Sequence, residues 1–418
     1  MRRVVVTGMG IWSCIGQDLH TVTDSLRQGR SGIIFDPKRI EYGLQSGLVG
    51  NVPRPNLKSM LPRKYRASMP EDAEYAYMAV KGAFYQAGIF DEYCKKNEVG
   101  ILWGNDSGAS SIADGIATLE QYHEAMMLGP NKIFQVGASS VVMNLSTIFH
   151  LRGCSITTAA GCASSSHAIG LAMMLIQSGK QEMVVVGGSS EIHPMMSAAF
   201  DATNVLSLRN SAAVRASRPF DKDRDGMVFS GGAAVLVLEE YEHAVARGAH
   251  ILAEVCGYGF SSNGIEEISM PSADAEYIAM KRALDDAGLQ PSDIDYVNAH
   301  ATSTVAGDIE EAKALTRLFA SKINNQKSII NNRPFISSTK SLTGHENWMA
   351  GASEAVYSIL MMQNNFVAPN INLEHKIDEA KDLNIVSETV YTPINTVLSN
   401  SSGMGGTNSA LVFRKIGS

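Results

Sequence analysis

Short apolar runs typical of β-strands alternate, along almost the whole chain, with segments whose apolar residues recur every three to four positions, as in amphipathic helices. In the first part, strands are predicted at residues 3–7, 99–103, 183–186 and 234–239, with a helix at 21–27. A second series comes after it, with strands at 251–258, 295–299 and 335–338 and helices at 273–287 and 308–319. This alternation predicts an α/β fold with largely parallel sheets.

The length of 418 residues exceeds that of a typical single domain, so we expect two domains or a duplicated architecture with a large core. The two series resemble each other in order, although no repeat is legible in the amino acids themselves. We place the boundary near Gly248 to Ile251, which gives the units 1–250 and 251–418.

Composition narrows the class of protein. No apolar run reaches the roughly 18 residues that a membrane span needs, and Arg2-Arg3 leads directly into a strand, so we expect a cytoplasmic protein without a membrane partner. The five cysteines are scattered and form no C-x-x-C pair, which favours neither a disulfide framework nor a zinc site, and we expect no metal. A net charge of −7 argues against nucleic-acid binding.

Cys162 lies in a turn of small residues, 157–166, that opens a helix continuing through Ile169. Such a turn predicts an exposed thiol at a helix N-terminus, where free N–H groups and the helix dipole stabilise the nucleophilic thiolate. The alternative is a buried structural cysteine, which is the commoner role of an isolated one.

Two later segments, 298–304 and 340–345, each place a histidine where a predicted strand passes into a loop, His300 and His345. A thiol and two imidazoles could form an acyl enzyme and stabilise negative charge on a second substrate. Their separation in the sequence does not show that they meet.

These segments, with 219–226, Gly307-Asp308, Gly351 and 400–408, resemble the β-ketoacyl-acyl-carrier-protein synthases, condensing enzymes of types I and II in the thiolase superfamily. The resemblance runs from Arg2 to about Arg414, with the motifs in the same order. It implies a thiolase-like five-layer α-β-α-β-α sandwich of two related halves. The first half would carry the nucleophilic cysteine and the second the two histidines.

The resemblance also implies a mechanism. Cys162 would accept an acyl group from an acyl carrier protein, with the backbone N–H groups of Cys162 and Met404 as the oxyanion hole. Malonyl carrier protein would then lose CO₂, and His300 and His345 would stabilise the enolate that attacks the acyl enzyme. The enzyme itself would hold no cofactor, because the phosphopantetheine belongs to the carrier protein.

The same resemblance implies supporting roles for further residues. Lys340 would tune the charge around His345, and Glu354 would anchor Lys340, unless the two form a plain structural salt bridge. Asp308 and Glu311 come after His300 on a new helix, where carboxylates favour the dipole. Thr302 and Thr304 would bind the phosphopantetheine arm through their hydroxyl groups. The alternative is that these hydroxyls form only local hydrogen bonds within the turn. These supporting residues are Lys340, Glu354, Asp308, Glu311, Thr302 and Thr304.

Arg63, Lys64 and Arg66 form a local basic cluster in an otherwise acidic chain. The cluster could steer an acidic carrier protein to the enzyme, whereas a solvated face is the ordinary role of such a charge run. We further expect a homodimer or a heterodimer with a related subunit.

Met227 and Met404 stand where many members of the family carry phenylalanine, at positions that gate and shape the substrate pocket. A dedicated synthase for an unusual chain is therefore the alternative to fatty acid elongation, as the catalytic or chain-length subunit of a heterodimer in an aryl polyene-type pathway. Chain-length partners typically lack the nucleophile, and Cys162 is present. A degradative thiolase would need a second cysteine late in the chain, but the last one is Cys256.

Overall fold

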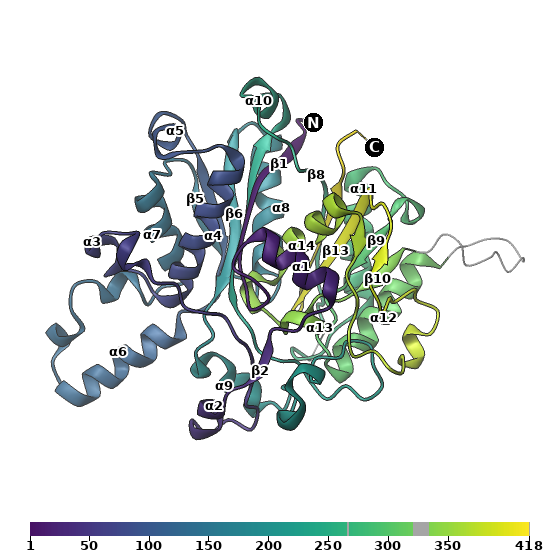
Figure 1. Cartoon of the computed structure of the whole chain (residues 1–418), viewed down its shortest axis with the longest axis horizontal. Coiled ribbons are helices and arrows are strands. Elements are labelled where there is room, and N and C mark those ends of the chain that lie inside the picture. The colour runs from purple at the N-terminus through teal and green to yellow at the C-terminus, as the bar shows by residue number, and fades with distance from the viewer. Residues whose placement is uncertain (266, 321–333, 418) are drawn as a thin grey trace, which may run out of the picture.

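A computed structural model describes residues 1–265, 267–320 and 334–417 (Figure 1). Its main sheet has ten strands, of which the first five belong to the first half of the chain: β1 (Val4–Trp12), β4 (Gly100–Gly104), β5 (Ser155–Thr158), β6 (Met183–Ser190) and β7 (Gly232–Glu240). The second half supplies β8 (Ala253–Ser262), β9 (Tyr296–Asn298), β10 (Phe335–Ser337), β13 (Thr396–Gly403) and β14 (Thr407–Arg414). Every strand predicted from the sequence is present, with bounds shifted by a few residues.

The two halves of the sheet have one topology. The first runs β1-β7-β6-β4-β5 and the second runs β8-β14-β13-β9-β10. In each half the first strand pairs antiparallel with the last, the last pairs antiparallel with the strand before it, and the remaining pairs are parallel. The prediction of largely parallel sheets is therefore wrong, because two of the four pairings in each half are antiparallel.

Six helices cover the strands in layers. α8 (Ser164–Gln177) and α14 (Ala350–Asn364) contact each other between the two halves, and each also contacts strands of both. α4 (Glu71–Ala87) and α7 (Ser140–Phe149) cover the outer face of the first half, and α11 (Ala273–Ala287), with α12 (Val305–Phe319) beside it, covers that of the second. The predicted five-layer α-β-α-β-α sandwich is confirmed.

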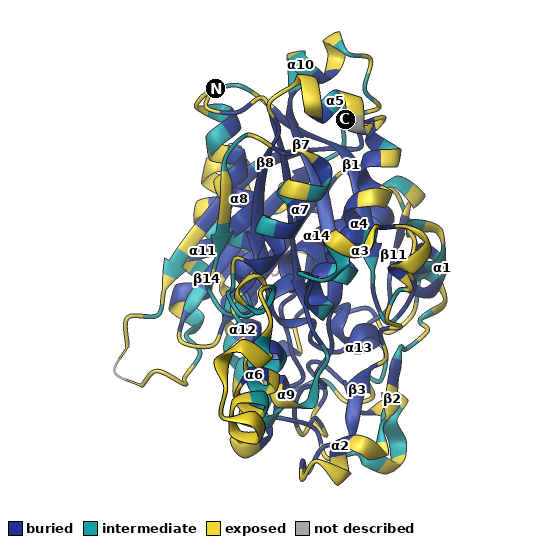
Figure 2. Cartoon of the chain, turned by 90° about the vertical axis from the view of Figure 1, so that its left-hand side faces the viewer, coloured by how far each residue is buried: buried dark blue, intermediate teal, exposed yellow. Residues whose placement is uncertain are grey.

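The halves join where β1 and β8 pair antiparallel, Val5 opposite Glu254 and Val6 opposite Ala253. Between the sheets, α14 is buried along residues 350–362 because small and apolar side chains surround its axis. Figure 2 shows the strands buried, whereas exposed positions concentrate on outer helices and loops such as α6 (Ala109–Tyr122).

One packing motif occurs in both halves. A Cβ added at Gly10 of β1 would lie 1.9 Å from the carbonyl oxygen of Ala79 on α4, and one at Gly8 would lie 2.4 Å from that of Ala83. In the second half, Gly259 and Gly257 of β8 face the carbonyls of Ala279 and Ala283 on α11 at 2.0 and 2.2 Å. The glycines let each outer helix approach its strand closely. These matching glycine and alanine pairs are a sequence repeat that the pattern of apolar and polar positions did not reveal.

The connecting segments hold the remaining α-helices and strands. They are α1 (Leu19–Gln28), α2 (Pro37–Glu41), α3 (Arg63–Arg66), α5 (Asp91–Lys96), α9 (Pro194–Ala202), α10 (Tyr241–Ala246), α13 (Lys340–Thr343), and two small sheets, β2 (Ile33–Phe35) with β3 (Leu48–Gly50) and β11 (Phe366–Val367) with β12 (Val390–Tyr391). Among the helices that the structure describes, none has the length and apolar character needed to cross a membrane.

Candidate active site

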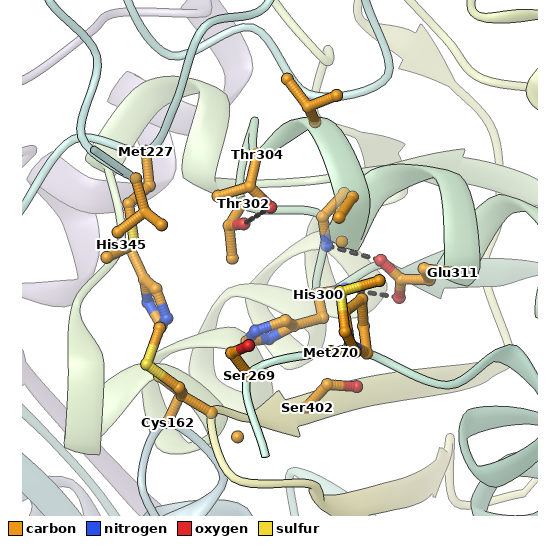
Figure 3. Close-up of a pocket in the computed structure, with 18 of the residues that line it drawn as sticks. Cys162, Met227, Ser269, Met270, His300, Thr302, Thr304, Glu311, His345 and Ser402 are labelled. Carbon is orange, nitrogen blue, oxygen red and sulfur yellow. Dashed lines mark hydrogen bonds between the residues drawn. The ribbon is translucent and has the colours of Figure 1, made fainter. Parts of the chain in front are cut away.

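A pocket of about 330 Å³ opens where loops follow β5, β9 and β13, and Cys162, His300 and His345 all line it (Figure 3). The cysteine and the histidines are far apart in the sequence, yet the two related halves bring their strand ends together. The wall also includes Met227, Thr302, Thr304 and Met404. The structure thus assembles the predicted thiol, imidazoles and substrate-contacting residues in one cavity.

Cys162 sits on the turn between β5 and α8, with Gly161 before it in the left-handed conformation at φ 54°. The Ser164 hydroxyl closes this turn, since it accepts from the Ala160 N–H at 2.8 Å and donates to the Gly161 carbonyl at 2.6 Å. The side chain faces the pocket and is only 6% exposed. The predicted exposed thiol is therefore wrong, because the turn lies beneath the second half of the molecule.

Burial raises the pKa of Cys162 to about 11, although the backbone N–H groups of Met404 and of Cys162 itself, and the charge of Lys340, act in the opposite direction. Removal from water outweighs these favourable interactions, so the resting group is a neutral thiol and not the thiolate that the helix dipole suggested. The two N–H groups nevertheless converge on the sulfur, which is where an acyl oxygen needs donors.

His345 follows α13 and is held by a segment of the first half. Its N–H donates to the Val228 carbonyl at 2.7 Å, and its own carbonyl accepts from the Ser230 N–H at 2.9 Å. The Nδ1 atom accepts from the Asn347 N–H at 3.2 Å, so the proton of the neutral ring is on Nε2. That Nε2 is buried without a hydrogen-bond partner, and the ring lies beside Cys162 in the pocket (Figure 3).

His300 follows β9 and presents a second imidazole at right angles to the first, with ring centroids 5.2 Å apart and planes at 85°. Lys340 Nζ lies 3.3 Å from its Nδ1, which again leaves the proton on Nε2. Burial lowers the pKa of both histidines well below the usual value, and the charge of Lys340 lowers each further. Both rings are neutral N–H donors at physiological pH.

Lys340 and Glu354 form a fully buried ion pair. Burial raises the pKa of Glu354 to about 7 and the Lys340 ammonium opposes this shift. The sequence predicted that Lys340 tunes the charge around His345, and its ammonium does lower the pKa of that histidine. Its direct contact, however, is with His300, because the short helix α13 turns its side chain toward the loop after β9.

Asp308 and Glu311 on α12 accept hydrogen bonds from the amides of neighbouring loops. Asp308 accepts from the N–H groups of Phe220 at 2.7 Å and Ser303 at 3.1 Å, two residues held at positive φ of 62° and 72°. Glu311 accepts from the N–H groups of His300 at 2.8 Å and Ala301 at 2.6 Å. The carboxylates therefore fix the shape of the loop that carries the imidazole, which a dipole interaction alone does not explain.

Thr302 and Thr304 line the pocket with their hydroxyl oxygens 3.0 Å apart. Met227 is buried in the wall, whereas the side chain of Met404 is 52% exposed at its edge. The basic residues of α3, Arg63, Lys64 and Arg66, do not belong to the pocket lining. Lys64 lies over the Tyr65 ring, and Arg66 donates to the Leu61 carbonyl at 3.0 Å.

Sequence reasoning gave no individual role to several polar residues of this region, among them the three that follow. Asn400 donates to Glu311 at 2.8 Å, and Glu276 and Ser402 line the pocket. Glu276 had a detectable signal, because it stands three and four positions before Ala279 and Met280 on the apolar face of a predicted helix.

Comparisons with known proteins agree with this arrangement. The N-terminal domain model of the β-ketoacyl synthases matches residues 1–244 and the C-terminal domain model matches residues 252–374. The 3-oxoacyl-[acyl-carrier-protein] synthase 1 of Escherichia coli is 39% identical, over all of both chains.

Solved structures give the same result. A β-ketoacyl synthase from Burkholderia phymatum, 36% identical, superimposes with a TM-score of 0.92 and full coverage of both chains. The ishigamide ketosynthase/chain length factor, 28% identical and again covered in full, has a TM-score of 0.90. Family models that span most of the chain, and likeness over its entire length, make this protein a member of the β-ketoacyl synthase family.

Proposed function

We propose that this protein is a β-ketoacyl-acyl-carrier-protein synthase, which joins an enzyme-bound acyl group to malonyl carrier protein by decarboxylative Claisen condensation. The observation that carries the proposal is one pocket in which the Cys162 thiol faces two neutral imidazoles, each with its proton on Nε2. The name of the E. coli relative supports the same reaction.

In the first half-reaction, the Cys162 sulfur attacks the thioester carbonyl of an acyl carrier protein. The C–S bond to phosphopantetheine breaks, and the proton of the Cys162 thiol ends on the departing thiol. The tetrahedral oxyanion forms beside the N–H groups of Cys162 and Met404, and one such donor is worth roughly 3 to 4 kcal/mol.

In the second half-reaction, the malonyl carboxylate leaves as CO₂ and its electron pair forms an enolate. The Nε2–H groups of His300 and His345 donate to the developing enolate oxygen, because neutral donors in a dry pocket favour the charge as it appears. The enolate carbon then attacks the acyl carbonyl, the C–S bond to Cys162 breaks, and the departing thiolate takes a proton from solvent to restore the thiol. Lys340, Glu354, Asp308 and Glu311 position these donors, and Thr302 and Thr304 bind the phosphopantetheine arm; the enzyme itself needs no resident cofactor or metal.

The partner is an acyl carrier protein, as in the name of the E. coli relative, and the basic residues of α3 dock it. All three face solvent at least in part, and carrier proteins are acidic, so opposite charges favour the encounter. We place the enzyme in the cytoplasm and divide it into the units 1–250 and 251–418.

A dimer completes the proposal. β5 stands at one end of the main sheet with Ile156 46% exposed, and α6 exposes Ile112, Ile116 and Leu119. An exposed edge strand and an exposed apolar helix face are each suited to pairing with a second chain. The partner is a second copy, or a related subunit such as the name of the ishigamide ketosynthase/chain length factor describes.

The second candidate is a synthase dedicated to an unusual chain, in which this protein is the catalytic subunit of a heterodimer in an aryl polyene-type pathway. Met227 and Met404 favour it, because flexible thioethers stand at the pocket wall and at its edge.

The test is to mix the purified protein with acyl carrier proteins of several chain lengths and malonyl carrier protein, and to identify the 3-oxoacyl products by mass. We expect an acyl adduct on the wild type and on Cys154→Ala, whose thiol is only partly buried and lies outside the pocket. Cys162→Ala should show no adduct. A full-occupancy adduct on Cys162→Ala would overturn the proposal.

A further inference from the structure

One buried carboxyl of the pocket takes no part in the arrangement described above. Glu276, in the first turn of α11, is 2% exposed and lines the same cavity as Cys162 and His300. Its Oε2 is buried without a hydrogen-bond partner. By contrast, Asp308 and Glu311 each accept hydrogen bonds from two loop amides.

The fold does not require a carboxyl at this position. α4 and α11 pack in the same register, since Ala79 and Ala279 face equivalent glycines on β1 and β8. The residue three positions before Ala279 is Glu276, and the residue three before Ala79 is Ala76, which is fully buried. The first half therefore fills the equivalent site with a methyl group.

Ser402, near the end of β13, stands beside Glu276 in the pocket lining (Figure 3 shows Ser402 at the floor of the cavity). Its hydroxyl is buried without a hydrogen bond of normal geometry and points to the Glu276 carboxyl, whose ionised form it favours by a weak hydrogen bond. Two buried polar groups that satisfy each other only in part carry a desolvation cost that an occupant with matching groups would remove.

The charges around Glu276 indicate which occupant matches. Burial raises the pKa of Glu276 well above the usual value, and the carboxyls of Glu311, Glu310 and Asp308 raise it further. A protonated carboxyl donates one hydrogen bond and accepts another, as does a serine hydroxyl. The complement of this pair is a neutral group that both donates and accepts, and the simplest such group on an acyl chain is a hydroxyl.

We propose that Glu276 and Ser402 form a subsite that binds a hydroxyl group on the acyl chain, so that the enzyme prefers hydroxylated acyl carrier proteins over unsubstituted chains of the same length. The inference rests on the proposed condensing function and assigns the substrate class of its pocket. A pocket built to bond a hydroxyl discriminates against the analogue that lacks it, because its own polar groups are then left unpaired.

The experiment uses pairs of acyl carrier proteins of equal chain length, one unsubstituted and one with a hydroxyl at each successive carbon in turn. The rate of Cys162 acylation is measured by intact mass at limiting substrate. We expect the wild type to prefer one hydroxyl position by at least about tenfold. The ratio of interest is the acylation rate with the preferred hydroxylated chain divided by the rate with the unsubstituted chain. Glu276→Ala, which copies Ala76 of α4, should bring this ratio close to one, and Ser402→Ala should lower it.

Glu276→Gln should keep most of the preference, because an amide also donates and accepts. Asp274→Asn is the matched control, since this exposed carboxyl in the same first turn of α11 lies outside the pocket lining, and it should leave the ratio unchanged. A ratio that is the same in wild type and Glu276→Ala would overturn the subsite. If Glu276→Ala lowered the acylation rate equally for the hydroxylated and the unsubstituted substrate, the subsite would also be overturned. That pattern is expected of a residue that binds the phosphopantetheine arm or supports the fold.

Aminoacyl carrier proteins are a further set of substrates for the same assay. If the wild type preferred an amino-substituted chain and Glu276→Gln abolished that preference, the ligand of the subsite would be an ammonium group, and the proposal of a hydroxyl would be wrong. Failure of the condensing function is distinguishable, because the wild type would then form no adduct even with unsubstituted chains.

Discussion

The two halves of the molecule share one framework but differ in the loops at the ends of their strands. β1 with α4 and β8 with α11 use the same glycine and alanine contacts, so the framework is closely repeated. At the ends of the equivalent strands β5 and β10, however, the first half places Cys162 and the second places Lys340 and His345. The repeated strands determine the positions at which side chains can enter the pocket, and the loops determine which functional side chains occupy those positions.

The difference extends to the last pair of strands. In the second half, β13 and β14 are joined by residues 404–406 alone, and this short turn brings the Met404 N–H to Cys162. In the first half, the equivalent connection, residues 191–231, is long, and the strand-like segment before β7 instead holds His345 through Val228 and Ser230. Each half thus supports the functional group of the other, and the active site exists only at their junction.

The largest expected effect tests the division of labour between the halves. Replacing His300 or His345 with alanine removes a proposed enolate donor that belongs to the second half, so decarboxylation of malonyl carrier protein should fall about 10²- to 10³-fold. Acyl transfer to Cys162 should fall by less than about tenfold, since its oxyanion donors are backbone N–H groups. The two rates are measured separately, by CO₂ release and by intact mass.

His167→Ala is the matched control, because this partly buried histidine bonds Tyr258 at 2.7 Å outside the pocket and should change neither rate. If the His300 and His345 variants lost decarboxylation and acyl transfer to the same extent, the two histidines would not act chiefly in decarboxylation.

The second prediction concerns the thiol of the first half. Because burial raises the pKa of Cys162 to about 11, the thiolate fraction should grow about tenfold for each pH unit between pH 7 and 9. Alkylation by iodoacetamide, followed by intact mass with Cys162→Ala as the background, should rise in proportion. If the alkylation rate levelled off below pH 8, the pKa of Cys162 would be lowered, as the helix dipole predicts, and not raised by burial.

The sequence predicted much of this framework, since the helix at 273–287 has the bounds that its periodicity gave. Cys162, His300 and His345 were identified because each follows a strand in a distinctive motif. Their burial was not predictable, because it depends on the opposite half covering each loop. The direct contact of Lys340 with His300 was not predictable for the same reason: a side chain's partner across 40 residues is set by tertiary packing.

The third prediction tests the surface of the first half. Reversing Arg63, Lys64 and Arg66 to glutamate should raise the KM for acyl carrier protein about tenfold with kcat unchanged, because exposed charges contribute modestly to affinity and chiefly to encounter. The wild-type rate should fall with added salt, which screens such charges over roughly 8 to 10 Å. Acyl pantetheine without the carrier is the control substrate, and its kinetics should stay the same. Unchanged kinetics with the carrier-bound substrate would leave the cluster as an ordinary solvated face.

The smallest expected effect concerns the turn of the second half that reaches Cys162. Met404 is half exposed at the pocket edge, and its three rotatable bonds let it repack around a rigid or wide acyl chain. Met404→Phe should therefore lower the ratio of kcat/KM for a polyene or aryl acyl carrier protein to that for a short saturated one, by a few-fold. The short substrate should react as before, because the backbone N–H of residue 404 is retained. Met195→Phe, at an equally exposed methionine outside the pocket, should leave the ratio unchanged. If Met404→Phe leaves it unchanged as well, the side chain only fills space, and the pathway dedicated to an unusual chain loses its main support.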